Sequence, residues 1–209
     1  PCMTAYRARL TESDIRRLIK SDAEDERAAA AHKLCRSIDR MPLDEADRAA
    51  AQKILTVMAN DTAELVRRAL AVTLKSSDLM PREVARRLVA DVDSVALPII
   101  TSSPVFTDDD LIEIVRAGSA VRQNAVASRH RVPRDVATVL AAEGGVSAVR
   151  ALAANDNADI SEAALGVVID RFGQTSEIVA AIAYRQVLPL SVTERLVALA
   201  SDAVREHLV

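Results

Sequence analysis

Aromatic residues are nearly absent from this chain of 209 residues, which has no tryptophan, two tyrosines and two phenylalanines. Many single-core domains depend on aromatic side chains, because each one buries a large area. The core must therefore be built mainly from alanine, valine, leucine and isoleucine. The same scarcity excludes a nucleic-acid binder that stacks bases on aromatic rings.

Glycine and cysteine are also scarce. Five glycines leave few tight turns, which argues against a β-sandwich or a barrel. The two cysteines, Cys2 and Cys35, are too few for a metal knuckle or an iron–sulfur cluster and favour a reducing cytoplasm. No run approaches the ~18 apolar residues of a membrane helix, and no secretory signal opens the chain. We therefore expect a cytoplasmic protein without cofactor, metal ion or membrane contact.

The charges are nearly balanced, with 27 basic and 30 acidic residues and a net charge of −3. The part before Ser76 has 14 basic and 12 acidic residues, and the rest has 13 and 18. Such a balance gives no general attraction to a phosphate backbone.

A short pattern recurs along the chain, centred on a branched apolar residue that arginine often follows. Its six central residues are Val66, Val95, Val121, Val149, Ile178 and Val204. If these residues are equivalent, the spacings are 29, 26, 28, 29 and 26 residues. Such a period accommodates two short helices and two turns, which is typical of helical repeat proteins.

A second helix is expected in each repeat. Three of these helices have a proline as their expected first residue, namely Pro81, Pro133 and Pro189, where the missing N–H costs nothing. Two others begin at Asp108 and Ser161, whose side chains suit the positive end of the helix dipole. Further helices are expected over residues 11–20, 25–38 and 43–59.

These segments predict an all-α fold, an α-α superhelix or HEAT/armadillo-like solenoid of about six to seven two-helix repeats. We expect a flexible segment over residues 1–10 and a single domain over 11–209, less regular over 11–76 and regular over 77–209. Val204, Leu208 and Val209 form an apolar stripe with nothing after it to pack on. We therefore expect the domain to be part of a longer chain.

The order of the segments carries a family resemblance. The segments are LTESDIRRLI (10–19), ELVRRALA (64–71), DVDSVALPIITSSPVFTDDDLIEIV (91–115), ISEAALGVVI (160–169) and LPLSVTERLVALASDAVREHL (188–208). Together they resemble an uncharacterised alphaproteobacterial family, domain of unknown function 2336. The resemblance implies helical repeats like those of HEAT and leucine-rich-variant proteins, and a longer chain, but no catalytic residues. The cysteine-rich segment that holds an iron–sulfur cluster in leucine-rich-variant proteins is absent.

Arginine follows the repeat valine at four positions, Arg67, Arg122, Arg150 and Arg205. In stacked helices about 8–10 Å apart, these guanidinium groups would form a ladder that binds the carboxylates or phosphates of a partner. The alternative is a set of salt bridges between repeats, to acids such as Asp61, Asp91 and Asp156.

Other candidate sites have simpler interpretations. Residues 108–110 are three aspartates that could ligate a cation, but compensation of the helix dipole explains them better. The basic segment 129–134 is expected to be a solvated turn rather than a phosphate site. The three histidines lack the spacing of a metal or catalytic site, and Cys35 is expected to be a small buried hydrophobe.

We therefore expect a noncatalytic protein–protein interaction module, which binds a peptide or a helix of an unidentified protein partner on the concave face of its repeats. Nucleic-acid binding by HEAT-like repeats is one alternative, against which the negative charge after Ser76 argues. An enzyme whose catalytic groups converge from distant repeats, without a linear motif, is the other. The sequence leaves the oligomeric state open.

Overall fold

The computed structural model describes residues 12–207. Its helices form two compact units, unit 1 over Pro1–Phe106 and unit 2 over Thr107–Val209. Unit 1 contains α1 (Glu12–Lys20), α2 (Glu24–Arg40), α3 (Glu45–Ala59), α4 (Glu64–Leu74), α5 (Arg82–Val89) and α6 (Asp93–Ser102). Unit 2 contains α7 (Asp108–Ala117), α8 (Ala120–Ala127), α9 (Arg134–Glu143), α10 (Val146–Ala154), α11 (Glu162–Phe172), α12 (Ser176–Ala183) and α13 (Leu190–His207).

The all-α class is confirmed. Over residues 12–207 the pairing of β type is limited to one parallel bridge, between Val132 and Ala158. The segment that we expect to be flexible, residues 1–10, lies outside the described residues. The single domain over 11–209 stays a prediction.

The helix ends follow local sequence signals. Thr107 and Asp110 form a capping box at the start of α7, and Ser161 caps α11. Pro81 and Pro133 are the N-cap residues of α5 and α9. The expectation of proline as the first helical residue is thus wrong by one position, because each of these helices begins at the residue after its proline.

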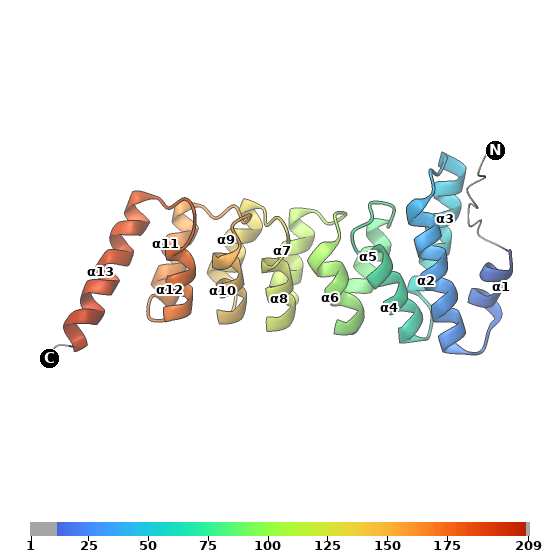
Figure 1. Ribbon diagram of the computed structural model, residues 1–209, viewed down its shortest axis with the longest axis horizontal. Helices are drawn as coiled ribbons and strands as arrows, with labels where there is room; N and C mark the ends of the chain where they lie inside the picture. The colour runs from blue at the N-terminus through green and yellow to red at the C-terminus, as the bar shows by residue number, and fades with distance from the viewer. Residues whose placement is uncertain (1–11, 208–209) are drawn as a thin grey trace, which may run out of the picture. The chain divides into compact units, whose positions relative to one another are not determined.

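Each unit has two layers of helices. In unit 1, α4 packs against both α2 and α6, and α3 packs against α5 (Figure 1). In unit 2, α10 packs against α8 and α12, while α7, α9, α11 and α13 pack in order. Helices that follow one another also pack in pairs, from α1 with α2 to α11 with α12. We call α2, α4 and α6, and α8, α10 and α12, the even layers; α3 and α5, and α7, α9, α11 and α13, are the odd layers.

Small and branched side chains fill both cores. In unit 1, Leu34, Leu70 and Leu88 are at most 1% exposed, and in unit 2 Leu140 and Leu152 are fully buried. Phe106 only borders the unit 1 core. The prediction of a core without aromatic centres is confirmed, because thin pairs of helices leave no large space for rings to fill.

The end of the chain differs from the sequence prediction. The pattern predicts one helix up to Ala200 and a further repeat helix from Asp202, but α13 is a single helix of 18 residues. No glycine or proline interrupts this stretch, so the backbone hydrogen bonds continue through it. Val204 is 59% exposed on this helix, and Leu208 and Val209 lie outside the described residues.

Candidate interaction surface

In unit 1, arginine side chains join neighbouring helices of the even layer. Arg27 on α2 donates to the Asp61 carboxylate before α4, with Nη2 3.2 Å from Oδ1. Arg67 on α4 does the same with Asp91 before α6, where Nη2 lies 3.0 Å from Oδ1. Arg67 Nη1 also donates to the Asp61 carbonyl at 2.8 Å. The paired residues are 34 and 24 positions apart, so each ion pair spans about one repeat.

The pair of Arg67 and Asp91 is largely shielded from solvent. The two side chains are 15% and 5% exposed. The Arg67 guanidinium lowers the pKa of Asp91 below its ordinary value of 3.8, and a hydrogen bond from the Val92 N–H acts in the same direction. The same contact with Asp91 raises the pKa of Arg67. Arg67 therefore forms a salt bridge between repeats, which is the alternative that the sequence left open for this residue.

Unit 2 contains comparable links. Arg150 on α10 donates to Glu177 on α12 at 2.9 Å, but these side chains are 53% and 67% exposed. Arg185 instead donates to the carbonyls of Ala153, Asn155 and Ala158 at 2.9–3.1 Å. Burial lowers the pKa of Arg185. Its guanidinium thus ties the loop after α12 to the end of α10.

The tetrapeptide Ser-Ala-Val-Arg occurs in both α8 and α10, but at different positions in the two helices. Ser119 is the N-cap of α8, whereas Ser147 is the second residue of α10, whose N-cap is Gly145. As a result, Val121 is 53% exposed, while Val149 is fully buried. The expected equivalence of these two valines is therefore wrong, because the tetrapeptide begins at a different position of the helix in each case and its side chains point in different directions.

The four candidate arginines do not form one ladder. Arg122 is half-buried on α8, and Arg150 is exposed on α10 of the same even layer. Arg205 lies on α13, in the odd layer, where its Nη1 is 3.7 Å from Asp202 Oδ1. Arg205 lies outside the even layer because α13 continues through it, whereas the sequence pattern assigns this residue to a separate helix. Partner binding by Arg122, Arg150 and Arg205 stays a prediction.

A different set of side chains is exposed on α4. Leu65 and Val72 are each 46% exposed. Arg68 is exposed as well, and so is Lys75, the C-cap residue that continues the helical backbone conformation after Leu74. Residues seven apart on a helix lie nearly above one another, about 10 Å apart along the axis. Leu65 and Val72 therefore form an apolar row, with Arg68 and Lys75 in a basic row beside it.

The neighbouring helix α2 adds a cation on the other side of the apolar row. His32 Nδ1 on α2 lies 2.8 Å from Thr73 Oγ1 on α4, so Thr73 marks the side of α4 that meets α2. Arg36, one turn beyond His32, is exposed. Among the side chains of residues 15–206, Arg36, Arg68 and Lys75 form no ion pair. We call Arg36, Leu65, Arg68, Val72 and Lys75 the α2–α4 face.

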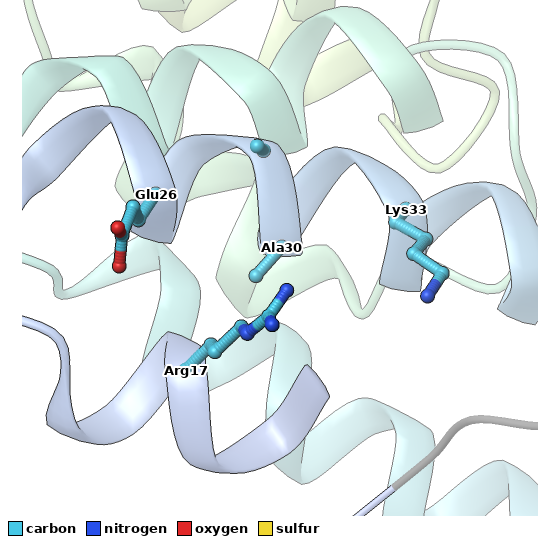
Figure 2. Close-up of a pocket in the computed structure, with 5 residues that line it drawn as sticks. Arg17, Glu26, Ala30 and Lys33 are labelled. Carbon is cyan, nitrogen blue, oxygen red and sulfur yellow. The ribbon is translucent and has the colours of Figure 1, made fainter. Parts of the chain in front are cut away.

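A pocket of about 370 Å³ lies between α1 and α2 and is lined by Arg17, Glu26, Ala29, Ala30 and Lys33. Figure 2 shows Arg17 of α1 extending toward α2 at Ala30, with Glu26 and Lys33 at the two sides. Glu26 accepts a hydrogen bond from Ser21 Oγ at 2.8 Å. The lining thus offers charged groups of both signs that can bind polar side chains.

Three other candidates from the sequence have definite surroundings in the structure. The Asp110 carboxylate is buried and accepts the Thr107 N–H at 3.0 Å, as a capping residue does. The basic segment 129–134 is not a wholly solvated turn, because Arg129 is half-buried, which lowers its pKa, and Val132 is fully buried. Arg134, at its end, is exposed and pairs with Asp159 at 3.0 Å. Cys35 is fully buried, and burial raises the pKa of its thiol to about 12.

In the part of the chain that the structure describes, no group of three or more His, Cys, Asp or Glu side chains is placed to hold a metal ion. None of the helices over residues 12–207 is long and apolar enough to span a membrane.

Arg68 and its neighbours on α4 were missed by the sequence analysis, which took Arg67 as the candidate. A signal was present, since ELVRRALAVTLK places two apolar and two basic residues at intervals of seven. Whether Arg67 or Arg68 faces solvent depends on which side of α4 contacts α2 and α6. The packing directs Arg67 toward Asp91 and leaves Arg68 exposed.

Comparisons with known proteins support one part of the sequence analysis. The searches of curated proteins and of solved structures found no match. A family model described as "Uncharacterised protein conserved in bacteria (DUF2336)" matches residues 95–209. This range covers α6 from its third residue to the end of the chain, more than half of the sequence. The chain therefore belongs to the DUF2336 family of bacterial proteins.

Proposed function

We propose that the chain is a right-handed α-α superhelix of two-helix repeats that acts as a noncatalytic protein-interaction module. The layered packing inside each unit supports the repeat architecture. The ion pairs 24 to 34 residues apart add support, because they join corresponding positions of successive repeats. A stack of this kind holds its exposed side chains on a stable frame, which suits binding of a partner.

The observation that carries the binding proposal is the α2–α4 face. Exposed apolar side chains lie there between cations that form no ion pair in the described residues. Arg67, by contrast, forms the ion pair with Asp91. In unit 1 we therefore propose its neighbour Arg68, instead of Arg67, as the arginine that contacts the partner. Arg122, Arg150 and Arg205 remain proposed contacts on unit 2.

A protein suits this face better than a nucleic acid does. A phosphate backbone can neutralise Arg36, Arg68 and Lys75, but it offers no apolar group to Leu65 and Val72. A protein segment can cover the apolar row and pair with the cations at the same time.

Site-specific photocrosslinking tests this function. A benzophenone amino acid is placed at Val72 in the full chain, and at Val57 as the matched control. Val57 is 54% exposed on α3, in the odd layer, and Val72 is 46% exposed on α4. In a bacterium that carries the gene, we expect a discrete protein adduct from position 72, and none from position 57.

The adduct should disappear when Arg68 and Lys75 are both changed to glutamate, with the circular-dichroism spectrum unchanged. Equal adducts from positions 72 and 57, or none from either, would contradict the proposal. An adduct that nuclease removes would favour nucleic-acid binding instead.

A further inference from the structure

We infer that the α2–α4 face binds an acidic amphipathic α-helix of a partner protein; this inference rests on the proposed interaction function and specifies its partner. Leu65 and Val72 supply the apolar row, 46% exposed at each position. Arg68 and Lys75 lie on one side of this row, and Arg36 on α2 lies on the other. The arrangement is that of a helix interface in which an apolar seam has charged flanks.

The spacing of the row favours a helix over an extended peptide. Leu65 and Val72 are seven residues apart, or about 10 Å along the axis of α4. A partner helix with apolar residues at i and i+7 repeats at the same distance and can contact both side chains. In an extended strand, side chains on one side repeat about every 6.7 Å, so successive ones fall short of Val72 or beyond it.

The positive charge of the face indicates that the partner is negatively charged. Arg36, Arg68 and Lys75 are exposed and form no ion pair with any side chain of residues 15–206. Glu64, at the start of α4, accepts a hydrogen bond from Ser94 Oγ at 2.5 Å. Glu64 keeps its negative charge, and Asp39 on α2 is exposed near Arg36, so these two carboxylates offset two of the three positive charges without reversing the total. Acidic residues on both flanks of the partner helix would therefore pair with cations on both sides of the apolar row.

The experiment uses the full chain and three fluorescent peptides of equal length. The first is an 18-residue helix with leucine at i, i+3, i+7 and i+10 and glutamate on both flanks. The second replaces each glutamate with lysine, and the third keeps the acidic composition but has two central prolines that prevent a helix. Fluorescence anisotropy at low and at physiological salt measures the binding of each peptide.

The acidic helix should bind, and the lysine helix and the proline peptide should each bind at least about tenfold more weakly. Equal binding of the acidic helix and the proline peptide would show attraction to negative charge alone and overturn the inference. Tighter binding of a single-stranded oligonucleotide of equal charge would overturn it in favour of nucleic acid.

A variant with reversed charges distinguishes a loss of recognition from a loss of folding. The R68E/K75E variant should lose affinity for the acidic helix by about tenfold or more, and should gain affinity for the lysine helix. The gain requires a folded face, so it separates recognition from unfolding. The matched control is R48E/K53E, which reverses two exposed charges on α3 and should leave both affinities unchanged.

The two proposals can fail separately. If the benzophenone at position 72 captures a protein but the acidic helix does not bind, the interaction function stands and the helical partner is wrong. If neither experiment gives a specific result, both proposals are wrong.

Discussion

Replacement of Arg67 by alanine should destabilise the protein far more than replacement of Arg150 does. Both arginines follow a repeat valine and pair with an acid that lies about one repeat further on. Their surroundings differ, since Arg67 and Asp91 are 15% and 5% exposed, whereas Arg150 and Glu177 are 53% and 67% exposed.

The magnitude follows from what each change leaves behind. Without Arg67, the Asp91 carboxylate keeps the hydrogen bond from the Val92 N–H at 2.8 Å and the distant Arg87, 3.9 Å away. Breaking a fully buried ion pair costs about 3–5 kcal/mol; because this pair is only partly buried and Asp91 keeps other contacts, the expected loss is about 1–3 kcal/mol. An exposed pair such as that of Arg150 contributes about 0.2–1 kcal/mol.

Urea unfolding followed by circular dichroism measures both losses. A cycle of Arg67→Ala, Asp91→Ala and the double variant isolates the pair itself, and the double variant should lose less than the sum of the two single changes. Because the units could unfold separately, the transition midpoint is compared at two wavelengths before free energies are extracted. A loss below about 1 kcal/mol for Arg67→Ala, or equal losses at both sites, would refute the assignment of Arg67 to the fold.

Two further predictions concern pH and glycine. The pKa of Asp91 is lowered in the folded state, so its contribution to stability is present above its ordinary pKa and is lost as the pH falls below about 4. Acid titration of the unfolding free energy should show this loss, and Asp91→Asn should remove that part of the pH dependence. A Cβ at Gly144 would lie 2.4 Å from the Leu140 carbonyl oxygen, whereas one at Gly145 would have its nearest neighbour at 3.7 Å. Gly144→Ala should therefore lower the unfolding free energy by about 1–3 kcal/mol and Gly145→Ala by much less, and equal losses would contradict the crowding argument.

Helix positions could be predicted from the sequence because their signals are local. Apolar residues three or four apart give the buried stripes, and Thr107, Gly144 and Ser161 define helix ends through their own backbone and side-chain chemistry. The period of about 28 residues indicated pairs of helices, and it recurs in the spacing of the ion pairs.

The candidate site could be predicted only in part. The repeat pattern identified Arg67 as notable, but its pairing with Asp91 depends on a contact between segments 24 residues apart. Arg68, one residue later, points away from that contact and is exposed. Adjacent residues on a helix point about 100° apart. An error of one position in the expected helix orientation therefore exchanges the residue that contacts a neighbouring helix with the residue that faces solvent.

The sequence by itself determined that the chain is helical, that its helices pair at a regular interval and that its core needs few aromatics. Tertiary structure decided which face of each helix is covered. Two copies of Ser-Ala-Val-Arg show the difference, with Val121 exposed and Val149 buried. Backbone hydrogen bonds in a helix join residues four apart, so the local sequence determines where helices form. Burial of a side chain depends on the neighbouring helices, which the residues of the tetrapeptide do not specify.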